Sequence, residues 1–350
     1  MRIIDGDGHV MEDVAAIRKL LPKDMRGVRE LFPPLDHFHG FVGETPPGSF
    51  RFDVGPKEWL DFLEDVGIES TVLYPTHGLA YGRMFHYDWA IAACRAYNDW
   101  VHAAYLSASK RFGAMALIPM QDPDEAVKEL RRAVRELGFA GAMLPSTGLP
   151  NHLGAKQYWP IYAEADRLGC ALAVHGGSHS GLGMDQLNVY PPVQGLGHPL
   201  GLVIGLGGVL FNGVLDRFPR ARFGFMEGGV AWVLMAQERF ERAHATHRQY
   251  NPRGELAPPA DASVSDYIRR HVREGRLCFG CEGDEPMIAE AIEQIGSGAF
   301  LYSSDFPHEV NNASCKHEIA EFVANNRIAP TDKEAVLHAN AQRFYGLAAS

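Results

Sequence analysis

The chain has 350 residues, a formal net charge of −10 at neutral pH and a hydrophobic content of 46%. This composition is enough for a large buried core, and it argues against nucleic acid or an anionic membrane surface as the main partner. A small anionic substrate remains compatible with it, because a metal ion or a local cation can dominate its own pocket.

Short apolar runs that end in a polar residue recur along the chain. Eight of them are typical of parallel strands that are buried on both faces. They span residues 2–7, 70–75, 112–119, 141–144, 171–175, 222–227, 277–282 and 300–305.

Segments of helical periodicity separate these runs. Residues 122–137 are the clearest, with proline and acidic residues at the start, basic residues later and a glycine directly after. The other predicted helices span 89–106, 155–169, 231–248, 284–296, 317–325 and 331–346. The alternation predicts one domain over residues 1–350, a (β/α)8 TIM barrel with C-terminal helices. An open doubly wound sheet is the alternative, but its nucleotide-binding form lacks the expected glycine-rich motifs here.

Two long insertions interrupt the predicted barrel. They cover residues 13–55 after the first strand and 176–200 after the fifth. Loops that follow barrel strands lie on the face that carries the active site, and loops of this length are usually functional or disordered. Their aromatic, histidine and methionine content favours ordered lids.

No uninterrupted apolar stretch reaches the roughly 18 residues of a membrane span, and the longest candidate, 201–211, is short and rich in glycine. The N-terminus has no basic-then-apolar signal segment. Five scattered cysteines are typical of a reducing compartment. We therefore expect a cytoplasmic protein without a membrane partner.

Polar residues gather at the ends of three predicted strands. Because alternate strand residues face the same way, Asp5, Asp7 and His9 are expected to share one side of the first strand. His175 ends the fifth strand and Asp305 the eighth. Taken singly, such residues are more often caps or hydrogen-bonded core groups. Their convergence at one barrel mouth, however, favours a site for Zn²⁺, Mn²⁺ or Fe²⁺.

Four motifs carry a resemblance to a known family: IIDGDGHVMED, LAVHGG, FPRARFGFMEGGVAW and YSSDFPHE. Together they resemble the amidohydrolase-2 branch of the amidohydrolase superfamily, the group of aminocarboxymuconate-semialdehyde and γ-resorcylate decarboxylases. The resemblance covers nearly the whole chain. It implies one divalent ion, Zn²⁺ or Mn²⁺, and a homodimer. It places the metal ligands at Asp7, His9, His175 and Asp305.

Asp7 resembles the carboxylate variant of a position that is histidine in many family members, and this second anionic ligand tilts the expectation slightly towards Mn²⁺. Glu12 completes the first motif, and we expect it either to orient a ligand or to cap the next segment. The apolar segment 201–215 also suggests a dimer, with a buried helix as the alternative.

The sixth strand departs from the resemblance. Decarboxylases of the family have a catalytic histidine there, whereas this chain has Glu227. An acid beside a dication stays ionised, so Glu227 is predicted to act as a base or to accept hydrogen bonds. The alternative is a structural pair with a neighbouring arginine or histidine.

Further polar residues follow the same strand ends. His308 and His198 are the preferred proton donors or substrate contacts. The guanidinium group of an arginine could bind a substrate carboxylate through two parallel hydrogen bonds. For the weaker candidates an ordinary surface or hydrogen-bonded role is the alternative. These are His77, His179, Arg51 and Arg83.

The leading hypothesis for function is a metal-dependent lyase. Its small-molecule substrate would be an aromatic or ring-cleavage carboxylic acid that chelates the ion, and His308 or a group linked to Glu227 would protonate carbon as CO₂ leaves. The first alternative is a hydrolase of esters, lactones or amides that uses metal-activated water, with Glu227 or Asp305 as the base. A hydratase and a non-catalytic relic of the fold are the others.

Overall fold

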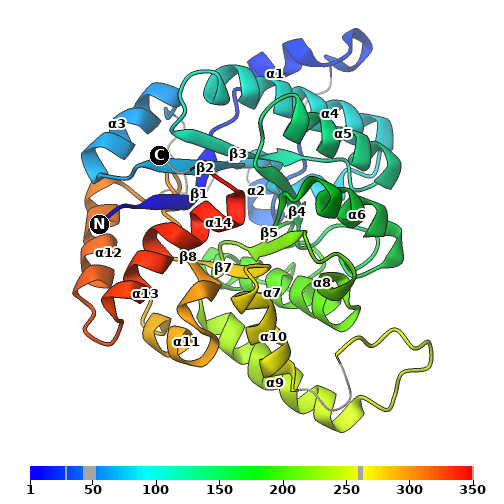
Figure 1. Ribbon diagram of the computed structural model, residues 1–350. Helices are drawn as coiled ribbons and strands as arrows, with labels where there is room; N and C mark the ends of the chain where they lie inside the picture. The colour runs from blue at the N-terminus through cyan, green and yellow to red at the C-terminus, as the bar shows by residue number, and fades with distance from the viewer. Residues whose placement is uncertain (28–29, 42–52, 259–262, 349–350) are drawn as a thin grey trace.

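Eight parallel strands form a nearly closed barrel in the computed structural model, which describes residues 1–350 except 28–29, 42–52, 259–262 and 349–350 (Figure 1). Neighbouring strands pair in chain order from β1 to β8. Their bounds are β1 Ile4–Val10, β2 Ser70–Pro75, β3 Phe112–Leu117, β4 Gly141–Pro145, β5 Ala171–His175, β6 Arg222–Phe225, β7 Leu277–Cys281 and β8 Phe300–Tyr302. The predicted (β/α)8 barrel is confirmed.

The helices surround the barrel, and each main helix follows a strand as a crossover connection (Figure 1). They are α1 Val14–Leu20, α2 His37–Phe41, α3 Pro56–Val66, α4 Tyr87–Val101, α5 Pro123–Arg135, α6 Trp159–Leu168, α7 Tyr190–Phe211, α8 Val214–Arg217, α9 Ala231–His247, α10 Val264–Arg273, α11 Ile288–Ile295, α12 Asn312–Ala324, α13 Pro330–Glu334 and α14 Asn340–Tyr345. Short 3₁₀ or π segments complete the fold, among them η2 His77–Arg83.

Burial explains why the strands read as continuous apolar runs. Every residue of β1, β4, β5, β7 and β8 is buried, because the barrel interior lies on one side and the helices on the other. The helices are amphipathic instead. For example, Asp122 caps α5 by accepting hydrogen bonds from two backbone N–H groups of its first turn.

The two ends of the chain meet where the barrel closes. The segment after β8 runs along β1, with hydrogen bonds from Asp305 N to Asp7 O (3.0 Å) and from His9 N to Phe306 O (2.8 Å). Beneath them, the hydroxyl of Tyr345 in α14 donates to the carbonyl of Gly6 at 2.5 Å. The metal-ligand candidates near both termini are therefore fixed to one another by backbone contacts.

The structure corrects several predicted boundaries. The sixth and eighth strands end at Phe225 and Tyr302 and do not reach Glu227 and Asp305. Both of these residues have positive φ, 55° for Glu227 and 56° for Asp305, so the chain leaves the extended conformation before it reaches them. Helices α1, α3 and α10 were not foreseen.

Helix α7 begins inside the predicted insertion 176–200 and is longer than the sequence suggested. It runs over 22 residues with a mean hydropathy of 1.4, so by length and composition alone it is apolar enough to cross a membrane. The uninterrupted apolar stretch at 201–211 is only the last part of this helix, because glycines and Pro199 hide the helical periodicity of the residues before it. In the fold 56% of its most apolar window is buried, as in the core helix of a soluble protein.

Candidate metal centre

Four predicted ligands converge at the carboxyl ends of the barrel strands. Asp7 and His9 lie in β1, His175 is the last residue of β5, and Asp305 follows β8. The Nε2 atom of His9 is 3.6 Å from Asp7 Oδ1 and 3.3 Å from Asp305 Oδ1, and that of His175 is 3.5 Å from Asp7 Oδ2. An ion with bonds of about 2.1 Å sets neighbouring ligand atoms about 3.0–3.4 Å apart, and all three distances lie within about 0.2 Å of that range, so small shifts of these side chains would suit one cation.

Both histidine rings are oriented by backbone carbonyls. His9 Nδ1 lies 2.8 Å from the carbonyl oxygen of Pro75, and His175 Nδ1 lies 3.2 Å from that of Gly176. Since a carbonyl can only accept, each Nδ1 carries the proton and each Nε2 presents its lone pair to the cluster. This is the tautomer that a metal ion requires.

Unpartnered buried atoms test whether the residues fit an ion. Buried polar atoms are nearly always hydrogen-bonded, and leaving one without a partner costs free energy. Here atoms of several facing side chains have no hydrogen-bond partner among the described residues. They are Asp7 Oδ1, His9 Nε2, His175 Nε2, Glu227 Oε2 and Asp305 Oδ1. Imidazole nitrogens and carboxylate oxygens without partners are the donors that a divalent cation binds. Asp7, His9 and His175 form one group of potential ligand atoms, and His9, Glu227, Asp305 and His308 form another, so the donor set fits a metal ion.

The crowding of acids shifts the protonation of the cluster. Burial, together with the negative charges of Glu227 and Asp7, raises the pKa of Asp305 well above its usual range. Burial opposes the charge of His175, but Asp7 and Glu227 outweigh it and raise the pKa of that ring. Burial lowers the pKa of His9 to about 3. A cation at the centre would take the place of the protons that the acids otherwise need.

Asp5 does not join the cluster, which corrects the expectation that it shares a side with Asp7 and His9. The pairing register with β2 shifts between Asp5 and Gly8, which adds one residue to β1 and breaks the strict alternation. The carboxylate of Asp5 instead accepts hydrogen bonds from Thr71 Oγ1 (2.6 Å) and from the backbone N–H of Ser304 (2.8 Å). It therefore ties β1 to β2 and to the end of β8.

Glu227 lies inside the ligand cluster. Its Oε2 atom is 3.1 Å from His175 Nε2 and 3.7 Å from His9 Nε2, and its Oε1 atom is 3.5 Å from His198 Nε2. The alternative role predicted for Glu227 was an ion pair with a neighbouring arginine or histidine. All three of these neighbours are histidines, and His9 and His175 are expected ligands themselves. The sequence identified the residue but not this position among the donor atoms.

His308 connects Asp305 to the second strand. Its Nδ1 atom is 2.8 Å from Asp305 Oδ1, and its Nε2 atom is 3.0 Å from Thr76 Oγ1. The ring also lies over His9, with centroids 4.1 Å apart. Burial lowers the pKa of His308, which favours the neutral ring, and Nδ1 and Asp305 Oδ1 form a close contact between the two side chains.

His198 and His179 form a buried pair beside Glu227. Their rings meet edge to face with centroids 4.8 Å apart. His179 Nδ1 lies 3.4 Å from Asp36 Oδ2, and Asp36 also accepts from His39 Nδ1 at 2.9 Å. Sequence reasoning missed Asp36, although it lies in the predicted 13–55 insertion. The signal available was the local D-H-F-H sequence at residues 36–39.

Glu12 caps the segment that follows β2 and does not touch the ligand cluster. Its two carboxylate oxygens accept hydrogen bonds from the backbone N–H groups of Thr76, His77 and Gly78 at 2.9–3.1 Å. Its Oε2 atom also lies 3.0 Å from His77 Nδ1. Burial opposes its charge, but the contact with His77 lowers the pKa of Glu12. Of the two roles expected for Glu12, this geometry corresponds to the cap.

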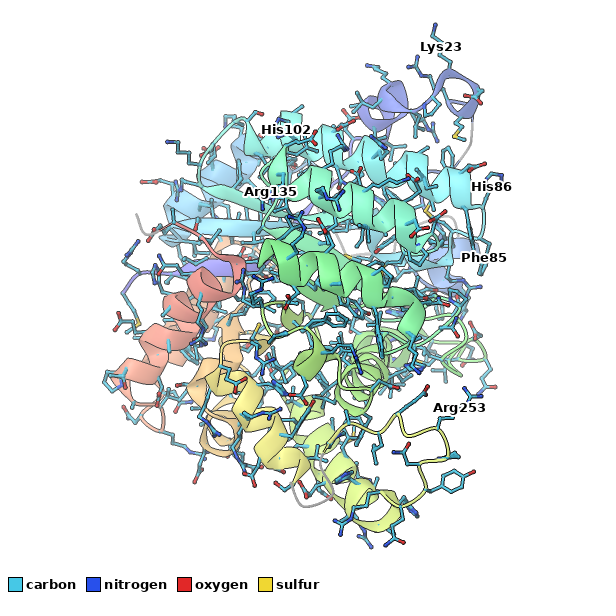
Figure 2. All side chains as sticks on the ribbon, turned by 45° about the vertical axis from the view of Figure 1, so that its right-hand side comes forward. Lys23, Phe85, His86, His102, Arg135 and Arg253 are labelled. Carbon is cyan, nitrogen blue, oxygen red and sulfur yellow. The ribbon has the colours of Figure 1, made fainter. Side chains whose placement is uncertain are left out.

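Of the two arginine candidates, Arg83 is described by the structure and is not among the residues brought to the cluster. The guanidinium of Arg83 lies 5.9 Å from the ring centroid of Phe85, which is 75% exposed and lies at the edge of the molecule (Figure 2). Arg51 falls outside the described residues.

Two histidines and several carboxylates at the carboxyl-end mouth of a (β/α)8 barrel define a metal-dependent barrel enzyme. Comparison with known proteins then identifies the family. A family model described as amidohydrolase matches residues 65–347, and the chain belongs to that family. The resemblance seen in the sequence is thereby confirmed.

The relatives are decarboxylases. The chain is 34% identical to decarboxylase orsB of Emericella nidulans over 269 residues, covering 71% of this chain and 75% of that protein. It is 24% identical to γ-resorcylate decarboxylase of Polaromonas over 302 residues, covering 81% and 85%. The barrel superposes on 5-carboxyvanillate decarboxylase LigW from Sphingomonas paucimobilis with a TM-score of 0.75 at 19% identity, covering 99% of each chain. A dihydroxybenzoic acid decarboxylase from Polaromonas with bound manganese and 2-nitroresorcinol gives a TM-score of 0.66 at 19% identity, covering 100% of this chain and 98% of that one.

Proposed function

We propose that this protein is a metal-dependent decarboxylase of an aromatic or ring-cleavage carboxylic acid. The observation that carries the proposal is the convergence of Asp7, His9, His175 and Asp305, whose inward-facing atoms are buried and lack hydrogen-bond partners among the described residues. The named relatives, which act on aromatic carboxylic acids, support the reaction and the substrate class.

Manganese is the ion that we propose. Carboxylate oxygens favour harder cations, and this cluster has more acids than a purely histidine-based zinc site would. A manganese-containing neighbour supports the choice. A bound divalent ion would act as a Lewis acid that holds chelating oxygens of the substrate and offsets the charge that develops during the reaction.

Asp305 and His308 are the proposed acid pair. During decarboxylation the bond between the ring carbon and the carboxyl carbon breaks, CO₂ leaves, and one proton is added to the ring carbon. Asp305 lies at the mouth of the barrel, and His308 Nδ1 lies 2.8 Å from its Oδ1 atom, close enough for a proton to pass between the two side chains once they align. Thr76 fixes the opposite nitrogen of the ring. Asp305 is therefore the group that faces the substrate, with His308 behind it.

The proposal is tested by metal analysis together with a substrate screen. We expect the purified protein to contain about one divalent ion per chain and to release CO₂ from a 2,6-dihydroxybenzoate or a 5-carboxyvanillate type of acid. Asp7→Asn should lose both metal and activity. Hydrolysis of an ester or lactone panel without CO₂ release would instead support the hydrolase. A metal-free wild-type protein without turnover would support the non-catalytic alternative.

We also propose a homodimer that forms through the outer face of α7. Most of this helix is buried, yet Leu196 is 46% exposed and Ile204, two turns later on the same face, is 52% exposed. Exposed apolar side chains in such a row favour contact with another protein surface. Ile204→Asp should shift the protein from dimer to monomer in light scattering. An unchanged mass, or a monomeric wild-type protein, would contradict this.

A further inference from the structure

A fifth donor completes the ligand cluster. Around its centre, the unpartnered buried atoms include not only those of the four predicted ligands but also Glu227 Oε2. This oxygen lies 3.1 Å from His175 Nε2 and 3.7 Å from His9 Nε2, the same range as the distances among the predicted ligands. It also belongs to a group of potential ligand atoms, with His9 and Asp305, that lie within 4.8 Å of one another.

Glu227 and Asp305 share an unusual backbone conformation. They are the only non-glycine residues with positive φ in the described part of the chain, at 55° and 56°. A left-handed conformation is unfavourable at an ordinary residue, and glycine would avoid that cost. Such a strained backbone is kept only where the packing of the surrounding residues holds it in place, and this is common at functional sites. Each acid follows the end of its strand, and each turns a carboxylate oxygen towards His9; Glu227 also faces His175.

The orientation of Glu227 does not suit a general base. A base must present a free oxygen to the proton that it removes. Here Oε2 faces the two ligand histidines, and Oε1 faces His198 Nε2 at 3.5 Å. Both oxygens are therefore directed at side chains of the protein.

We propose that Glu227 binds the metal ion through Oε2, as a fifth protein ligand, while His198 holds Oε1. This inference rests on the proposed metal site and replaces the role of base predicted from the sequence. The resulting ligand set has two imidazoles and three carboxylates, which is harder and more negative than the four-residue set. It should therefore favour Mn²⁺ over Zn²⁺ more strongly.

Metal affinity separates a ligand from a base. We expect Glu227→Gln and Glu227→Ala to weaken Mn²⁺ binding by at least about 100-fold, beyond the 10–100-fold loss typical of residues that only support a ligand. In the cobalt-substituted protein, the visible absorption should become stronger as a ligand is lost and the coordination number falls. Asp7→Asn is the positive control.

Glu282→Gln is the matched control for a neighbouring carboxyl group that is not a proposed ligand. Glu282 lines the same small cavity of about 10 Å³ as Asp7, Glu227 and Asp305, but it is not among the grouped ligand atoms. We expect its substitution to change Mn²⁺ affinity by no more than about fivefold, as for an interaction between partly solvated charges. An equal loss in Glu282→Gln and Glu227→Gln would show that charge alone matters and would overturn the inference.

Folding of the variants is checked on the metal-free proteins. Apo Glu227→Gln should still unfold in one cooperative transition, because the amide keeps the shape of the side chain. Unchanged Mn²⁺ affinity and an unchanged cobalt spectrum in both Glu227 variants would overturn the ligand role and leave the proposed function intact. A wild-type protein that binds no Mn²⁺ would overturn both.

Discussion

Single side chains in this site are held by partners that fix which atom faces the centre. The carbonyl of Pro75 holds the Nδ1 proton of His9, and Asp305 and Thr76 together hold both nitrogens of His308. These contacts set tautomers as well as positions, and a change at Thr76 or His308 should therefore affect the chemistry without removing a ligand.

The Asp305–His308 pair can be tested with two substitutions. We expect His308→Asn to lower kcat at least about 100-fold, the usual effect of losing a group that takes part in proton transfer. Thr76→Val removes one hydrogen bond to the ring and should lower kcat about tenfold, equivalent to about 1.4 kcal/mol. Metal content should match the wild type in both. Loss of metal in His308→Asn would place this residue among the ligands instead.

His198 should behave differently from His308. If it holds Glu227 Oε1, His198→Asn should weaken Mn²⁺ binding about 10–100-fold, as expected for a residue that orients a ligand. At saturating Mn²⁺ most of the activity should return. A kcat that stays low when metal is saturating would mean that His198 transfers the proton itself.

The sequence allowed candidate ligands to be proposed but not their full arrangement. Strand ends in a parallel barrel must meet, so Asp7, His175 and Asp305 could be placed together from the pattern of apolar runs. The pattern could not show the extra residue in β1 that turns Asp5 away, because alternation assumes a regular strand. It also could not show the left-handed backbone that brings Glu227 inward.

Among the secondary-structure elements, α5 and α6 are joined by a buried carboxylate. Glu164 of α6 lies 2.9 Å from Arg131 of α5 and 2.6 Å from Arg167. The hydrogen bond from Arg167, helped by Arg131, lowers the pKa of Glu164 to about 2. The folded pKa is below the unfolded value, so this contribution to stability is present above about pH 4.5 and is lost as the pH falls towards about 2.

Denaturant unfolding at two pH values tests this contact. Because both arginines are about half exposed, we expect Glu164→Gln to cost only about 1 kcal/mol of unfolding free energy at neutral pH. Near pH 3 the difference from the wild type should become smaller, since Glu164 takes up a proton in the unfolded chain below about pH 4.5 while it stays ionised in the folded protein. A difference that stays constant or grows as the pH falls would show that the charge is not responsible.

The elements differed in how well they could be predicted. Strands buried on both faces give continuous apolar runs, and all eight were located. Helix α7 was misjudged because glycines and prolines dominate it, although its backbone still follows one long helix packed on the barrel. The helix propensity of single residues is a weak guide to secondary structure where tertiary packing determines the backbone conformation.

At the scale of the whole molecule, an ion would join distant parts of the barrel. The proposed ligands come from β1 and β5 and from the turns after β6 and β8. A ligand that binds only the folded state adds about 4 kcal/mol at a thousandfold excess over Kd. Chelation should therefore lower the Tm and Mn²⁺ should restore it, as followed by calorimetry. Asp305→Ala should abolish the rise in Tm that Mn²⁺ causes. A wild-type Tm that does not change when Mn²⁺ is added would contradict the proposed metal site.

The backbone of Asp305 is hydrogen-bonded to that of Asp7 where the barrel closes. These two parts of the site lie side by side in the fold, but the ribosome makes them at very different times. A nascent chain on the ribosome exposes Asp7 and His9 long before residue 305 has been made. Loading of the ion must therefore wait until nearly the whole polypeptide has emerged, and no amino-terminal fragment that stops short of β8 can assemble the centre.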